Sequence, residues 1–187
     1  MRAAVPLAKA YLLLNHGPVT LVSSRSGARS NVMAAAWAMP LDFDPPKVLV
    51  VIDRNTLTRE LVDASGEFAL NVPPRALAET IVGVGSVTGR DVDKWSRFGI
   101  ATLPASRIAA PLVDGCIAWL ECRVLDERPT ERRYDLFIAE VVAAWADERV
   151  FSAGRWHFED DALRTLHYVA GGQFFATGAA HAVGRGP

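Results

Sequence analysis

Polar side chains suited to ligand binding gather at predicted strand ends and turns in the first half of the chain. Asn31 can donate and accept hydrogen bonds, and Trp37 offers a flat apolar wall. Thr56 and Thr58 lie at a predicted helix start, where backbone N–H groups favour an anion, and Lys94 could add a positive charge. Each residue also has an ordinary structural role as a cap, a surface lysine or a core tryptophan. Together they favour a site that grips a phosphorylated polar heterocycle.

The sequence shows no motif of a common hydrolase, phosphate loop or metalloenzyme. The run from Gly83 to Gly89 does not fit G-x-G-x-x-G, because the third glycine would fall at Thr88, and we interpret it as a surface loop. The four histidines are not spaced as metal ligands. His167 could lie over a pocket or be a partly exposed strand residue. We therefore predict no catalytic side chain and no metal site.

Composition indicates an ordinary globular chain. Of 187 residues, 50% are hydrophobic and the net charge is −1, which argues against nucleic-acid or anionic-membrane partners. No apolar stretch is long enough for a membrane helix or a signal peptide, so we expect a cytoplasmic protein. Cys116 and Cys122 would lie roughly 20 Å apart along one strand, and we expect buried free thiols.

Hydrophobic alternation predicts more strands than helices. The expected strands are Val19–Ser24, Ala28–Trp37, Lys47–Ile52, Phe68–Val72, Cys116–Leu125 and Tyr134–Ala146. The expected helices are Thr56–Ser65, Arg75–Val82 and Lys94–Gly99, with Leu7–Asn15 a short helix or an edge strand and loops at Met39–Pro46 and Gly83–Asp93. Such strands, joined by hairpins and few helical crossovers, favour a closed or partly closed antiparallel barrel. We expect one domain over 1–176 and a flexible tail over 177–187.

The order of several segments resembles one known family. The segments are TLVSS, SNVMAAAW, DFDPPKVLVVIDRNTLTRELVDASGEFALNVP, DKWSRFG, LECRV and YDLFIAEVV. Through about Phe174 the chain resembles the flavin reductase-like family, and it is especially similar to the flavoredoxin branch. The resemblance implies a mainly β fold, a split antiparallel β-barrel with a few short helices, which binds FMN and works as a homodimer.

The resemblance also implies roles for individual residues. Asn31 and the backbone of Val32, Met33 and Ala34 would contact the isoalloxazine edge, with Trp37 near the flavin. The turn from Arg54 through Thr56 to Thr58 would hold the ribityl phosphate, and Lys94 would pair with that phosphate.

Two further segments bear on the predicted site. The family often places a histidine after an aspartate near the start of the last long strand, whereas this chain has Arg133-Tyr134-Asp135-Leu136. Tyr134 would therefore substitute for that histidine only sterically. The segment HYVAGGQFF resembles an aromatic tail that closes over the flavin, which adds Tyr168 and Phe174 to the predicted cofactor-binding residues.

The resemblance leaves three functions open. The first is an oxidoreductase in which NADH or NADPH reduces bound FMN, and the reduced flavin passes electrons to a small-molecule or protein acceptor. The second is a flavoredoxin-like electron carrier with a protein donor and no nicotinamide site of its own. The third is a barrel that stores flavin or serves as an interaction module.

Overall fold

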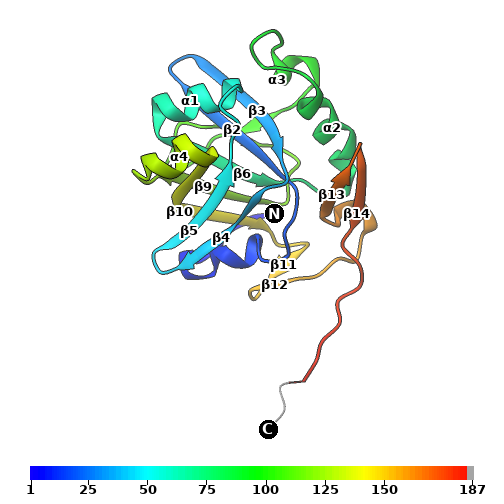
Figure 1. Ribbon diagram of the computed structural model, residues 1–187. Helices are drawn as coiled ribbons and strands as arrows, with labels where there is room; N and C mark the ends of the chain where they lie inside the picture. Colours follow the sequence, from blue (N-terminus) through cyan, green and yellow to red (C-terminus); the bar gives the residue numbers. More distant parts are fainter. Residues whose placement is uncertain (185–187) are drawn as a thin grey trace.

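The computed structural model describes residues 1–184 (Figure 1). Its strands are β1 (Arg2–Ala4), β2 (Thr20–Ser26), β3 (Arg29–Ala35), β4 (Ala38–Phe43), β5 (Pro46–Val51), β6 (Glu67–Val72), β7 (Thr102–Leu103), β8 (Leu112–Val113), β9 (Ala118–Val124), β10 (Leu136–Asp147), β11 (Phe151–Ser152), β12 (Arg155–Trp156), β13 (Leu166–Ala170) and β14 (Gln173–Ala176). Its helices are α1 (Leu57–Ser65), α2 (Ala78–Ser86), α3 (Lys94–Arg97) and α4 (Arg128–Tyr134), with short 3₁₀ segments η1 (Leu7–Leu13), η2 (Arg75–Leu77) and η3 (Asp161–Leu163).

One antiparallel sheet forms the body of the molecule. Its strand order is β3-β2-β6-β9-β10-β5-β4, and β1 pairs with the far end of β10. The two end strands, β3 and β4, are neighbours in sequence and are joined by two residues, Ala36 and Trp37. The sheet therefore curls until its ends approach each other at this corner, where β3 and β4 do not pair. This is the predicted mainly β, split antiparallel barrel.

The hydrophobic core consists of two clusters, because the strands near β3 are covered on both faces. One cluster fills the barrel and includes Phe68, Leu70 and Phe137. The other lies between the sheet and α2, and includes Val32 and Ala69. Strand β6 is buried on both faces, because α2 and the segment 100–117 cover the face that points away from the barrel.

Helix α1 begins and ends where its capping residues predict. The Thr56 side chain accepts a hydrogen bond of 3.1 Å from the backbone N–H of Arg59, as an N-cap does. Gly66 ends the helix with φ of 69°, a left-handed conformation that glycine adopts without strain. The Thr56 cap fixes the turn before the helix, and this turn forms part of the candidate site.

The glycine run was predicted as a loop, but its first part belongs to helix α2. The helix continues through Gly83 and Gly85 to Ser86. A Cβ atom added at Gly83 would lie 2.6 Å from the Phe98 ring, and one at Gly85 would lie 3.6 Å from Cβ of Ala34. Gly83 therefore permits close packing of α2 against Phe98, whereas a side chain at Gly85 would make an ordinary contact. The packing of α2 against its neighbours outweighs the low helix propensity of both glycines.

Other expectations for single elements were also corrected. The stretch Met39–Pro46 contains β4 because its backbone pairs with β5, despite Pro40. The polar connection before β10 contains α4, which places Tyr134 at a helix end instead of a strand start. The residues Leu7–Asn15 contain the 3₁₀ segment η1. The buried, free state of both cysteines was predicted correctly, although Cys116 lies before β9 and not within it. Strands β9 and β10 form a long antiparallel pair.

The C-terminal part forms the hairpin β13–β14 and then a tail. Figure 1 shows the hairpin beside α2 and the tail leading away from the barrel. Residues 177–184 contain no helix or strand, and the predicted tail residues 185–187 lie outside the described residues. None of the helices within residues 1–184 is long and apolar enough to cross a membrane.

Candidate functional site

A polar cavity of about 290 Å³ lies between β3, the start of α1 and the end of α2. Its lining includes Asn31, Met33 and Ala34, the turn 55–58, the segment 84–89 and Lys94. Asn31, Met33, Ala34, Thr56, Thr58 and Lys94 were all predicted to bind a cofactor. The structure therefore brings half of the predicted residues to one cavity.

Asn31 and Thr58 form the floor of this polar cavity. Both residues are buried, and Nδ2 of Asn31 donates a hydrogen bond of 2.9 Å to Oγ1 of Thr58. A Cβ atom added at Gly89 would lie 2.2 Å from Oδ1 of Asn31, so only glycine lets the loop after α2 pass so close. The floor therefore depends on residues from β3, α1 and this loop.

The start of α1 supplies hydrogen-bond donors to the polar cavity. Leu57 and Thr58 are the first two residues of α1 and line the cavity, and backbone N–H groups at these positions have no acceptor within a helix. Such donors, together with the helix dipole, favour an anion. This end of the cavity therefore has the chemistry of a phosphate site.

Lys94 adds a buried cation beside these donors. Asp93 caps the short helix α3 by accepting from the N–H groups of Trp95 and Ser96, which positions Lys94. Nζ of Lys94 donates a hydrogen bond of 2.7 Å to the Val84 carbonyl in the last turn of α2. Burial lowers the pKa of Lys94 from 10.5 to about 8. Because burial disfavours its charge, this ammonium group would interact strongly with an incoming anion.

An apolar cavity of about 300 Å³ adjoins the polar one. Its lining consists of Val19, Ala34, Ala35, Ala36, Ile81, Val82, Gly85, Ser86, Tyr168, Gly172 and Phe174. The rings of Tyr168 and Phe174 lie 5.4 Å apart between centroids, tilted by 60°. Two of the predicted aromatic residues therefore form part of an apolar wall that a flat ring could contact.

The hairpin β13–β14 carries this aromatic wall and is anchored at its base. The Val19 N–H donates to the Leu166 carbonyl, and Nδ1 of His167 donates to the Gly17 carbonyl at 3.0 Å. His16 lies beside His167 and bonds the Thr165 hydroxyl at 2.9 Å. Burial, helped by the nearby His167, lowers the pKa of His16 to about 4, so His16 is neutral at neutral pH. His167 thus anchors the hairpin and does not line the apolar cavity.

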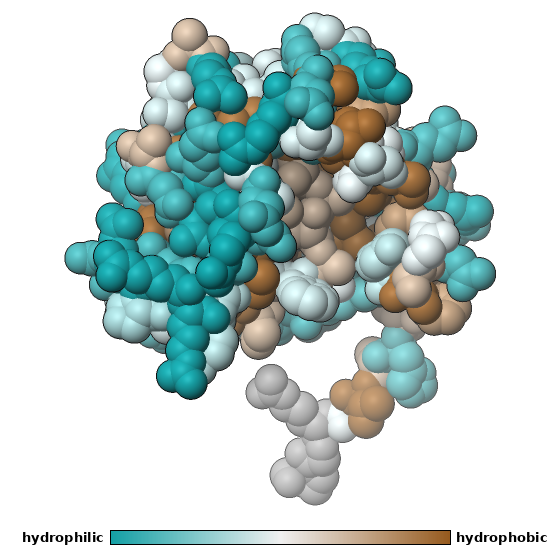
Figure 2. Space-filling view, turned by 45° about the horizontal axis from the view of Figure 1, so that its top comes forward, coloured by the Kyte–Doolittle hydropathy of each residue, from teal (hydrophilic) through white to brown (hydrophobic). Residues whose placement is uncertain are grey.

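The linings of the two cavities share Ala34, Gly85 and Ser86, so the cavities adjoin at these residues, and we call the two together the groove. Figure 2 shows apolar surface in a hollow at the centre of one face, with a hydrophilic surface on one side. Gly85, Ser86 and Ile81 also line the cavities but were not among the predicted residues. The signal for Gly85 and Ser86 is the apolar spacing of a helix that continues through the glycine run.

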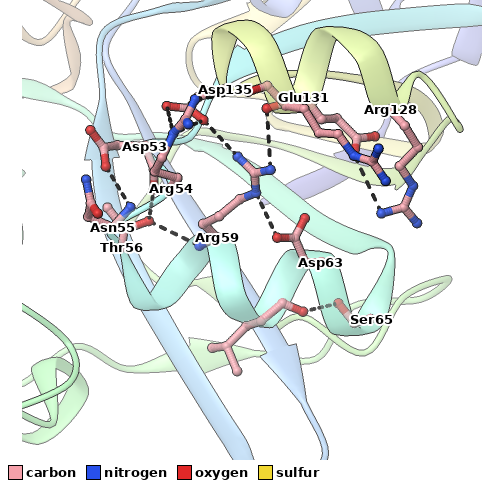
Figure 3. A network of polar contacts seen from close by, with 12 residues as sticks. Asp53, Arg54, Asn55, Thr56, Arg59, Asp63, Ser65, Arg128, Glu131 and Asp135 are labelled. Carbon is pink, nitrogen blue, oxygen red and sulfur yellow. Dashed lines mark hydrogen bonds and ion pairs between the residues drawn. The ribbon is translucent and has the colours of Figure 1, made fainter.

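Arg54 lies next to the polar cavity but does not line it. Figure 3 shows its side chain directed toward α4, where Nε donates to both carboxylate oxygens of Asp135 at 3.1 and 3.3 Å. Its Nη2 also donates to the Arg132 carbonyl at 3.0 Å. Arg54 was predicted as part of the turn that holds a phosphate; in the structure its guanidinium is held by Asp135 and does not line the polar cavity.

Three other predicted residues also lie outside both cavities. Val32 is fully buried in the core between β3 and α2, although its backbone belongs to end strand β3. Trp37 is 72% exposed at the corner between β3 and β4. Tyr134 is 59% exposed at the end of α4. Neither aromatic side chain lines the groove, although Trp37 directly follows the lining residue Ala36.

The chain is similar to a known domain family and to several known proteins. Residues 13–173 match the flavin reductase like domain. The chain is 45% identical over 177 residues to the Escherichia coli (strain K12) protein YddH, covering 93% of this chain and 94% of that protein. A solved FMN-binding domain of a flavin reductases-like enzyme from Shewanella baltica is 48% identical, covers 98% of each chain and superposes with a TM-score of 0.96.

A more distant structure shares the fold. Flavoredoxin of Desulfovibrio vulgaris (Miyazaki F) is 24% identical, with 89% of this chain and 90% of that one covered and a TM-score of 0.78. The family match spans most of the chain, and the fold and groove described above agree with it. The chain therefore belongs to the flavin reductase-like domain family.

Proposed function

We propose that the chain binds FMN in the groove, with the phosphate at the polar end and the ring system at the apolar end. The observation that carries this proposal is the junction of the two cavities at Ala34, Gly85 and Ser86. One end offers helix-start N–H groups and a lysine, and the other offers aliphatic and aromatic walls. A phosphorylated flavin has this same division between an anionic end and a flat apolar end.

The residues that line the groove fit this cofactor. Lys94 and the first turn of α1 would hold the phosphate, with Thr56 and Thr58 shaping that turn. End strand β3 has no strand partner on one side, so peptide groups around Met33 and Ala34 could hydrogen-bond the edge of a heterocycle. Tyr168 and Phe174 would keep water from one face of the ring.

Our proposed activity is an oxidoreductase that uses NADH or NADPH as its reductant. Bound FMN would supply the hydride and electron transfer, and the chain would supply binding, orientation and exclusion of water. This assignment is consistent with the match to the flavin reductase like domain and with a groove that needs no catalytic side chain of its own. The electron acceptor would be a small molecule or a protein.

We also propose that the protein is a homodimer formed through the corner between β3 and β4. Trp37, Met39, Leu41 and Phe43 are all exposed, on or next to end strand β4. Three of these side chains lie on β4 and Trp37 directly precedes it, and such a group of exposed apolar side chains is typical of an interface with another molecule. A second copy of the chain would cover all four side chains, including Trp37, which is otherwise exposed to solvent.

One experiment separates the candidate activities. The FMN-loaded protein is mixed anaerobically with NADH and, separately, with NADPH, and the flavin absorption band is followed. Rapid bleaching by either nucleotide supports the oxidoreductase. FMN binding without bleaching would favour the flavoredoxin-like carrier, and a colourless protein that does not bind FMN would contradict both.

A further inference from the structure

One carboxylate holds both sides of the turn that forms the phosphate end of the groove. Oδ1 of Asp135 accepts from Nε of Arg54 at 3.1 Å and from Nη1 of Arg59, also at 3.1 Å. Arg54 and Arg59 flank residues 55–58, which are the four turn residues that line the polar cavity. Asp135 itself does not line that cavity. Figure 3 shows its carboxylate between the two guanidinium groups.

The contacts around this carboxylate leave it little freedom. Its side chain is 18% exposed, and that of Arg59 is 11% exposed. Arg59 is also held by Oδ2 of Asp63 at 2.8 Å and by the face of the Phe137 ring, 4.6 Å from its centroid. The backbone of Asp135 accepts from the Ile52 N–H at 2.9 Å, just before the turn. The ion pair between Asp135 and Arg59 is thus supported by Asp63 from α1 and by Phe137 from β10.

Contacts within the turn connect this ion pair to the cavity. The N–H of Arg59 donates to Oγ1 of Thr56, and that hydroxyl donates to the Asp53 carbonyl at 2.8 Å. The Asn55 N–H donates to Oδ1 of Asp53 at 2.7 Å. A shift of Arg54 or Arg59 would therefore move the N–H groups of Leu57 and Thr58. Hydrogen-bond donors must be fixed to recognise an anion well, because otherwise binding must first order them.

We infer that Asp135 is a positioning residue, which fixes the turn 55–58 through Arg54 and Arg59 and so sets selectivity for a phosphorylated flavin. The inference rests on the proposed FMN site. Asp135 adopts φ of 56°, a conformation that asparagine and glycine also accept, so the carboxylate can be removed without backbone strain. The Arg132 and Arg133 side chains add positive charge nearby, but Arg54 and Arg59 are the residues that Asp135 binds.

The test compares FMN with riboflavin, which lacks the phosphate. Flavin-free wild-type protein and Asp135→Asn are titrated with each ligand by flavin fluorescence. We expect Asp135→Asn to weaken FMN binding about tenfold, within the range of couplings in hydrogen-bonded networks, while riboflavin binding stays within about twofold. Unchanged FMN binding, or an equal loss for both ligands, would overturn the inference.

A second variant and a control complete the design. If the Asn variant does not fold, Arg54→Gln removes one of the two guanidinium contacts from a more exposed position. Alone, Arg54→Gln should weaken FMN binding and leave riboflavin binding within about twofold, and an equal loss for both ligands would overturn the inference. Where Asp135→Asn does fold, the combined effect of the two substitutions on FMN should be less than additive, whereas full additivity would show that Arg54 binds the ligand independently of Asp135. Asp147→Asn breaks a comparable ion pair with Arg149, remote from the groove, and should leave the FMN-to-riboflavin ratio unchanged.

Amide hydrogen exchange in the flavin-free protein gives an independent readout. Asp135→Asn should speed exchange at residues 55–59, while Asp147→Asn should not. If wild-type protein does not prefer FMN to riboflavin, the proposed function fails, and the exchange result alone decides whether Asp135 positions the turn. Equal exchange at these residues in wild type and Asp135→Asn would overturn that role.

Discussion

Nδ2 of Asn31 in β3 donates a hydrogen bond of 2.9 Å to Oγ1 of Thr58 in α1, although the two residues lie 27 positions apart. The bond joins an end strand of the sheet to the start of a helix at the floor of the polar cavity. Both side chains are buried, so losing one partner would leave the other with a hydrogen bond fewer in a buried position. This contact therefore helps to fix both the stability of the fold and the shape of the site.

Replacing Thr58 with valine should show the cost of breaking this contact. Thr58→Val keeps the branched shape but removes the oxygen, which leaves Nδ2 of Asn31 buried without that acceptor. We expect the free energy of unfolding in urea to fall by about 1–3 kcal/mol. Thr58→Ser, which keeps the hydroxyl, is the matched control. A valine variant as stable as the serine variant would show that the bond contributes little.

The depressed pKa of Lys94 predicts how FMN binding depends on pH. A bound phosphate favours the charged ammonium group, so FMN affinity should fall as pH rises through about 8, where the flavin-free protein loses this proton. Riboflavin affinity should not follow this change. Lys94→Met should weaken FMN binding and remove its pH dependence near pH 8. Parallel pH profiles for FMN and riboflavin in the wild-type protein would argue against contact between Lys94 and the phosphate.

The same pKa shift predicts a trend in stability for the flavin-free protein. The pKa of Lys94 is about 8 in the folded chain and 10.5 in its ordinary state, so between these values the folded chain holds fewer protons than the unfolded chain. The contribution of Lys94 to stability therefore rises with pH across this window and is lowest below pH 8. Urea denaturation of wild type and Lys94→Met across the window would measure the difference, and a constant difference would contradict the shift.

Two glycines of α2 give a matched pair of variants. Alanine at either position gains helix propensity worth about 0.8–1 kcal/mol. At Gly83 the new Cβ would lie 2.6 Å from the Phe98 ring, so we expect Gly83→Ala to destabilise the protein. At Gly85 the nearest atom is 3.6 Å away, so Gly85→Ala should be neutral or stabilising. Because Gly85 lies where the two cavities join, that variant should also weaken FMN binding.

Thermal unfolding and FMN titration of both glycine variants test these expectations. If Gly83→Ala raised the melting temperature, the packing of α2 against Phe98 would be looser than the structure shows. If Gly85→Ala bound FMN as tightly as wild type, the ligand would not pass the junction of the two cavities. The second result would argue against the proposed position of the cofactor.

The exposed apolar residues of β4 predict the oligomeric state. Met39→Asp together with Leu41→Asp should convert the proposed homodimer to a monomer, because two carboxylates at the interface would lose hydration on association. Light scattering coupled to size-exclusion chromatography would measure the mass. Val183→Asp alters an exposed apolar residue of the tail and should leave the dimer intact. A wild-type monomer, or a variant that stays dimeric, would contradict an interface at β4.

Local sequence patterns predicted the barrel because most strands show a clear alternation of apolar side chains. The N-cap at Thr56 and the stop at Gly66 were also predictable, since they depend on nearby residues. The helical state of Gly83–Ser86 could not be predicted from nearby residues, because this part of α2 packs against Phe98 and Ala34, which are distant in sequence. The strand β4 was likewise hidden, because its pairing with β5 outweighs the proline within it.

The site was predicted in part for the same reason. Asn31, Thr58 and Lys94 have side chains suited to a phosphorylated ring, and the fold brings them together. The side chain of Arg54 has the same chemistry, but Asp135 holds it on the other side of the turn. No local pattern shows that ion pair, since its partners lie 81 residues apart. Side-chain direction at a turn thus depended on a long-range contact.

The central claim is that the polar end of the groove recognises a phosphate attached to a flavin. Its most direct test is a titration of the flavin-free wild-type protein with FMN and with riboflavin under identical conditions. We predict that FMN binds at least about tenfold more tightly than riboflavin, and that Thr58→Ala combined with Lys94→Ala removes most of this difference. Equal affinity of the wild-type protein for both flavins, or no binding of either, would contradict it.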